Sequence, residues 1–206
     1  MTEDVRLAMA GHPRWLPLPL EGDPDEAAGA LVDDLLLDLA DGETTVDFRD
    51  ETVAMVASTS RLVRRTADEL RATGLLTYAA WMLLPAPYLL LPGPGATLRL
   101  RDLLPGTSDD EVIAAATDLG RERHGAVDVD VLDDTAAGRA LSVRYRPVVR
   151  LDDGTPAVDE HRVVLWPHPE AGMTMELHLF STDLVEAGRA AEPLLELARA
   201  IEWQVG

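Results

Sequence analysis

Hydrophobic and polar residues alternate through much of the last eighty residues, a pattern typical of β-strands that bury one face. The alternation is clearest in four stretches, at 127–131, 141–146, 161–165 and 173–179. If the segment 133–139 closes a hairpin between the first two stretches, Asp128 lies near Arg144 and forms a cross-strand charge pair with it. Four antiparallel strands are therefore predicted here, followed by a helix.

That final helix begins near Asp183 or Glu192, because its apolar residues recur at helical spacing: Leu194, Leu197, Ala198 and Ile201. The middle of the chain predicts buried strands at 75–84 and 88–91, and a half-exposed strand at 97–101. Ser108 and Glu111 form a capping-box pattern that opens a further helix, which ends near 124–125.

Two helices are predicted in the N-terminal third of the chain. The first begins at Asp23, which can cap it, and runs to about 41–42. The second spans about 50–73 and carries a seam of mostly small residues at alternating spacings of three and four: Val53, Val56, Ser60, Val63, Ala67 and Leu70. Packing of this seam in the core is the favoured interpretation, and a homodimer through the 50–73 helix is the alternative.

These elements together predict an α+β fold, in which an antiparallel sheet is flanked by helices as an α/β/α sandwich, with an N-terminal helical pair. We expect a single domain over residues 1–206. Its N-terminal part, 1–74, is predicted to be helical, and its remaining part, 75–206, to be rich in strands and closed by the C-terminal helix.

The composition excludes several kinds of chemistry. The chain has no cysteine, and all 18 of its basic side chains are arginine. Without lysine there is no Schiff base or phosphate-loop lysine, and without cysteine there is no thiol nucleophile, disulfide or thiolate metal site. No Gly-x-Ser-x-Gly elbow is present, and the Pro92–Gly95 segment is a turn without the helix that a phosphate-binding loop needs. We therefore expect no cofactor.

The formal net charge of −19 repels nucleic-acid phosphates and anionic membranes, so neither is an expected partner. Solubility in the cytosol is the favoured interpretation of this charge, and a basic partner protein is the alternative. The longest apolar stretch, 83–91, is interrupted by two prolines and is too short to cross a bilayer, and no signal-peptide pattern opens the sequence. We therefore expect a cytoplasmic location.

The C-terminal half resembles the PsbP-like fold that is shared with LpqN-type lipoproteins. The resemblance lies in the stretch Met173–Phe180 and in a last helix that ends in an apolar–Ile–aromatic pattern at 194–203. It implies an antiparallel sheet flanked by helices that docks proteins or small ligands, generally without catalysis. The chain departs from that family in lacking a lipobox cysteine and in its extra helical pair, and no functional residue is carried over.

The histidines offer a metal-site candidate, because imidazole and carboxylate ligands suit zinc or iron. Its members are His161, Glu176 and His178, with His168 nearby. Alternation puts His161 on the core side with Val163, and it puts His178 on the other face. Ordinary strand histidines are therefore the favoured interpretation.

Two segments suit the binding of a partner better. Trp166 and His168 lie at a proline-stiffened hairpin tip, where an exposed indole would anchor a partner, although burial against the last helix is equally open. A buried strand pair is the favoured interpretation of residues 81–92, and the alternative is that Pro85, Pro87 and Tyr88 interrupt a strand at a sheet edge or pocket mouth. The sequence thus favours a non-enzymatic interaction factor, an adaptor, chaperone-like or immunity-like protein. One alternative is a module for a small apolar ligand held between the sheet and the helices, and another is a metal-assisted or acid/base hydrolase.

Overall fold

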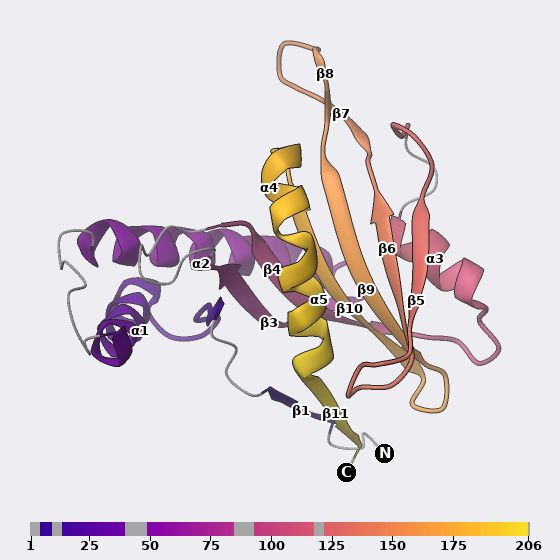
Figure 1. Cartoon of the computed structure of the whole chain (residues 1–206), viewed down its shortest axis with the longest axis horizontal. Coiled ribbons are helices and arrows are strands. Elements are labelled where there is room, and N and C mark those ends of the chain that lie inside the picture. Colours follow the sequence, from indigo (N-terminus) through magenta and orange to yellow (C-terminus); the bar gives the residue numbers. More distant parts are fainter. Residues whose placement is uncertain (1–4, 10–13, 40–48, 85–92, 118–121, 206) are drawn as a thin grey trace.

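The structure of the protein is a computed structural model that describes residues 5–9, 14–39, 49–84, 93–117 and 122–205 (Figure 1). It is an α+β fold, as predicted, in which five described helices flank a seven-stranded antiparallel sheet. The helices are α1 (Pro24–Leu39), α2 (Arg49–Arg71), α3 (Asp109–Thr117), α4 (Leu184–Arg189) and α5 (Ala191–Ala200). No described helix is long and apolar enough to cross a membrane.

The large sheet has the strand order β2-β3-β4-β10-β9-β6-β5, with every neighbouring pair antiparallel. Its strands are β2 (Trp15–Pro17), β3 (Leu75–Leu83), β4 (Gly95–Asp102), β5 (Asp128–Leu132), β6 (Ala140–Tyr145), β9 (Glu160–His168) and β10 (Met173–Ser181). Two small antiparallel pairs lie outside it, β1 (Val5–Met9) with β11 (Ile201–Val205), and β7 (Val148–Arg150) with β8 (Pro156–Val158).

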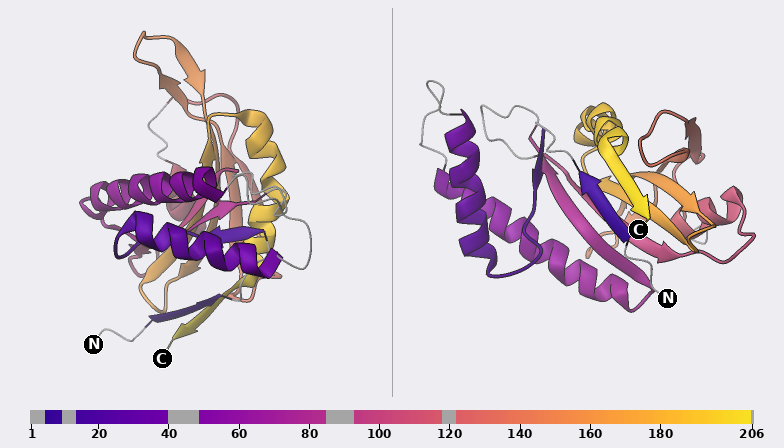
Figure 2. Two further views of the ribbon diagram at one scale, coloured as in Figure 1. Left: turned by 90° about the vertical axis from the view of Figure 1, so that its left-hand side faces the viewer. Right: turned by 90° about the horizontal axis from the view of Figure 1, so that it is seen from below.

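Helices cover the two faces of the sheet unequally. Helix α5 lies along one face over the central strands, where Leu194 and Leu197 pack against Leu177 and Trp166 (Figures 1 and 2). On the opposite face, α1 and α2 cover the β2–β3 end and α3 covers the β6–β9 end. The middle of that second face, over β4 and β10, therefore lies between α2 and α3, and we call it the open face.

Several local expectations are confirmed. The carboxylate of Asp23 accepts hydrogen bonds from the backbone at the start of α1, and Ser108 and Glu111 bond reciprocally at the start of α3. Asp128 pairs with Arg144 across β5 and β6, with 3.3 Å between carboxylate and guanidinium. The last helix ends at Ala200, so Ile201, although buried, belongs to β11.

The first part of the predicted seam of α2 packs in the core, where Val56 and Ser60 are fully buried and Val56 packs with α1 and β3. The rest of the seam, Val63, Ala67 and Leu70, is only partly buried, so core packing holds for part of the helix. A homodimer through this helix stays a prediction. The strand expected at 88–91 lies outside the described residues.

Candidate functional site

A groove crosses the open face between α2 and α3. Two adjoining cavities make up the groove, of about 260 Å³ beside α2 and about 270 Å³ toward α3 and β7. Arg99, His178 and Phe180 line both cavities, so the two are continuous at these side chains. Arg99 comes from β4, and His178 and Phe180 come from β10. We call the part beside α2 the α2 cavity.

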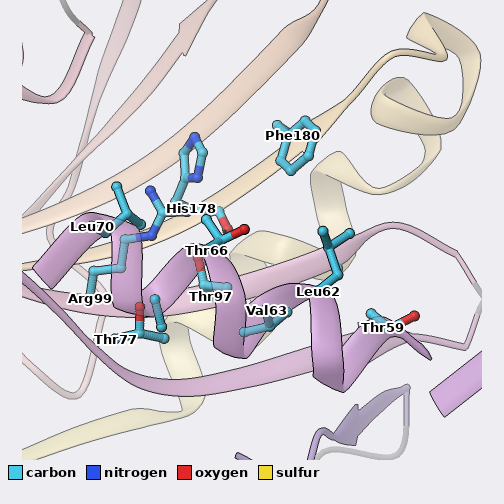
Figure 3. Close-up of a pocket in the computed structure, with 12 residues that line it drawn as sticks. Thr59, Leu62, Val63, Thr66, Leu70, Thr77, Thr97, Arg99, His178 and Phe180 are labelled. Atoms are coloured by element: carbon cyan, nitrogen blue, oxygen red, sulfur yellow. Dashed lines mark hydrogen bonds between the residues drawn. The ribbon is translucent and has the colours of Figure 1, made fainter. Parts of the chain in front are cut away.

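The α2 cavity has an apolar wall and a shallow floor. One side of α2 forms the wall with residues at helical spacing: Thr59, Leu62, Val63, Thr66, Ala67 and Leu70 (Figure 3). The floor facing it is made of small residues, Thr77 of β3 and Gly95 and Thr97 of β4. Because these residues do not fill the space beneath α2, the wall keeps exposed apolar surface, and Leu62 is 48% exposed.

The inner end of the α2 cavity, where α2 reaches Leu70, carries a partly buried cation, Arg99. Burial lowers the pKa of Arg99, while the nearby Glu176 carboxylate raises it. Glu176 lies directly opposite Arg99 in the strand register, yet its oxygen accepts a hydrogen bond from Arg101 at 2.8 Å. Among the described residues Arg99 makes no ion pair, and its buried Nε has no hydrogen-bond partner. Two guanidinium groups thus share one carboxylate here.

His178 lies next to Arg99 and is 91% buried, being 9% exposed. Burial lowers the pKa of His178 well below 6.5, and the charges of Arg99 and His161 lower it further, so the ring is neutral at neutral pH. Its Nε2 lies 2.9 Å from Nδ1 of His161. Its buried Nδ1 has no hydrogen-bond partner within the described part of the chain.

The two histidines belong to a row of rings across β6, β9 and β10. The ring of Tyr145 lies tilted against that of His161 with a centroid distance of 4.8 Å, and its hydroxyl lies 3.2 Å from Nδ1 of His161. His161 in turn faces His178 and Phe180, with ring centroids 5.0 and 5.8 Å away. Phe180 is half-exposed at the end of this row, where it covers both cavities.

The expectation that His161 and His178 lie on opposite faces is wrong. In the register of β9 and β10, His161 pairs with Phe180 and Val163 pairs with His178, and residues opposite one another in antiparallel strands share a face. The error came from using apolar neighbours to identify the core face. Apolar residues of β9 are buried on both faces of the sheet, so neighbours such as Val163 do not distinguish the faces.

The histidines converge, but the third proposed metal ligand does not join them. Glu176 is held by Arg101. Within the described residues, no group of three or more His, Cys, Asp and Glu side chains is close enough to hold a metal ion. The positive charge of Arg99 beside His178 also opposes a bound cation.

The described residues that were expected to bind a partner, Trp166 and His168, do not line the groove. Trp166 is fully buried in the cluster beneath α5, and its Nε1 donates to the Thr135 hydroxyl at 2.9 Å. Its indole therefore presents no surface. His168 ends β9, with its Nδ1 3.2 Å from a carboxylate oxygen of Glu170. Pro85, Pro87 and Tyr88 lie outside the described residues.

Sequence reasoning missed Arg99 and Tyr145 as site residues, and it favoured core packing for Val63, Ala67 and Leu70, which form half of the α2 wall. The alternation over 97–101 gave the one available signal, because it puts Arg99 and Thr97 on the face opposite Leu98. The chain matches no protein-family model, and no curated protein is significantly similar to it.

Proposed function

We propose that this protein binds a small ligand with an apolar body in the groove between α2 and the open face of the sheet. The observation that carries the proposal is the apolar wall of α2, which faces a floor of small side chains across a cavity of about 260 Å³. Ligand pockets are concave, largely apolar and provided with a few polar groups, as this one is. This is the second of the functions that the sequence left open.

Binding of a neutral apolar fluorophore such as Nile red tests the proposal. Ala67 lines the α2 cavity, so Ala67→Phe fills part of it, whereas Ala54→Phe adds the same side chain at an exposed position of the same helix. We expect saturable binding with one site per chain, weakened at least about tenfold in Ala67→Phe and unchanged in Ala54→Phe. Absence of saturable binding, or equal affinity in the two variants, contradicts the proposal.

Docking of a protein partner and hydrolysis stay predictions. The buried indole of Trp166 gives partner docking no support, while the net charge of −19 still favours a basic partner. For a hydrolase, the contact between His161 and His178 favours acid/base chemistry, but Glu176 is held away by Arg101. The apolar groove therefore has the stronger support.

A further inference from the structure

We infer that the ligand's polar group is a single carboxylate, bound at the inner end of the α2 cavity by Arg99 and His178. This inference rests on the proposed function and names the chemical class of its ligand: an aliphatic or aromatic monocarboxylic acid. Two independent observations support it: Arg99 makes no ion pair among the described residues, and a buried ring nitrogen of His178 has no hydrogen-bond partner there.

In the described structure, the positive charge of Arg99 is left without an ion pair by the way in which the arginines of β4 share a carboxylate of β10. Within the described part of the chain, Arg99 and Arg101 share the carboxylate of Glu176, and Glu176 accepts its hydrogen bond from Arg101. An isolated buried cation is costly unless it is paired, and guanidinium stays protonated. A carboxylate entering the cavity would neutralise the surplus charge, and it would accept hydrogen bonds from the guanidinium group of Arg99, which lines the cavity and makes no ion pair in the described chain.

The Nδ1 of His178, which has no partner among the described residues, supplies a second hydrogen-bond donor for the carboxylate. Nε2 of His178 is occupied by His161, so only Nδ1 remains for a ligand. When His161 donates to Nε2, the neutral His178 carries its proton on Nδ1 and donates it. The carboxylate would then accept one hydrogen bond from Arg99 and, after a turn of the His178 ring that brings its buried Nδ1 to the cavity, another from His178. Figure 3 shows these two side chains next to one another at one end of the α2 wall.

Arg99 and His178 also favour a ligand with one negative charge over a ligand with two. Arg99 supplies one surplus positive charge and His178 is neutral, so a phosphate dianion would leave a negative charge buried beside apolar side chains. Asp159, which lines the neighbouring cavity, also opposes a second negative charge. An alcohol of the same shape would leave Arg99 uncompensated, and an amine would add a like charge.

The test compares octanoate, octanol and octylamine as competitors of Nile red at pH 7 on the full chain. We expect octanoate to bind at least about tenfold more tightly than octanol, since a hydrogen bond between charged groups is stronger than one to a neutral hydroxyl, and octylamine to bind least. Equal affinity for octanoate and octanol overturns the inference while leaving the groove as a ligand site. Absence of binding by the dye and all three competitors overturns both proposals.

Variants then locate the carboxylate. Arg99→Gln should remove the preference for octanoate while leaving the affinity for octanol within about twofold, and Arg99→Lys should keep part of the preference because it keeps the charge. Arg139→Gln, which removes an arginine of an exposed pair with Asp109, is the matched control and should keep the preference in full. Retention of the full preference in Arg99→Gln overturns the inference, and the comparison of head groups in the unmodified protein does not depend on any variant folding.

Discussion

Glu160 is expected to make one of the largest single electrostatic contributions to stability in this protein. Its carboxylate is completely buried and accepts hydrogen bonds from three arginines. Arg144 donates to it at 3.0 Å, Arg146 at 2.9 Å and Arg162 at 2.6 Å. Burial raises the pKa of Glu160, but the three guanidinium groups outweigh burial and bring the pKa down to about 2.

The size of the contribution follows from that pKa. The difference between the ordinary value of 4.5 and about 2 corresponds to about 3 kcal/mol of folding free energy, at about 1.4 kcal/mol for each pKa unit. Breaking a buried ion pair by removing one partner costs about 3–5 kcal/mol in other proteins, which agrees with this figure. We therefore expect Glu160→Gln to lower the free energy of unfolding at pH 7 by about 3 kcal/mol.

The pH dependence provides a sharper check, because its sign is fixed. A carboxylate whose pKa is lower in the folded state stabilises the fold fully above about pH 4.5, and this contribution is lost as the pH falls toward 2. Urea unfolding of the wild type and Glu160→Gln at pH 7, 5, 4 and 3 should give a difference that is constant down to pH 5 and then shrinks. Asp109→Asn, which removes an exposed carboxylate from the pair with Arg139, should change stability by less than about 0.5 kcal/mol. A difference below about 1 kcal/mol between wild type and Glu160→Gln at pH 7, or one that grows as the pH falls, would refute this reasoning.

Three further changes test other parts of the structure. Trp166→Ala should lower the free energy of unfolding by about 3–5 kcal/mol in urea titrations, because it empties a fully buried site; a loss below about 1 kcal/mol would mean that the indole is exposed. Ser108→Ala should cost about 1 kcal/mol by removing the capping box of α3, and Thr107→Ala, a neighbouring hydroxyl outside that box, is its control; equal losses would contradict the capping role. Gly138→Ala should cost at least about 1 kcal/mol because residue 138 has φ +100°, and a stabilised variant would contradict that backbone conformation.

The fold could be predicted because each of its elements leaves a local pattern. Alternation identified β6, β9 and β10, and the capping patterns at Asp23 and Ser108 placed the starts of α1 and α3 within one residue. The pairing of Asp128 with Arg144 followed from the hairpin alone. Alternation, capping and hairpin pairing all involve residues that are close together in the sequence, so they can be recognised in a single sequence.

The site could not be predicted in the same way, because it depends on which face of each strand meets which helix. On β9, residues 163–166 are all buried, since α3 covers one face and α5 the other. Alternation then predicts that His161 and Val163 share a face of the sheet, but it does not predict which helix packs against that face. Trp166 was placed at a hairpin tip because the prolines that follow it indicate the end of a strand. β9 continues through Pro167 to His168, which leaves the tip at 169–172.

The junction between β4 and β10 also sets the order in which the groove can form. β3 and β4 are a local hairpin, as are β9 and β10, whereas the β4–β10 pairing joins residues 96–102 to residues 173–179. Pairings so distant in sequence close a long loop and form slowly compared with hairpins. Arg99 stands on one side of that junction and His178 on the other, so the groove exists only after the two hairpins have joined. In a refolding experiment, the moment at which a ligand first binds would therefore report the completion of the sheet.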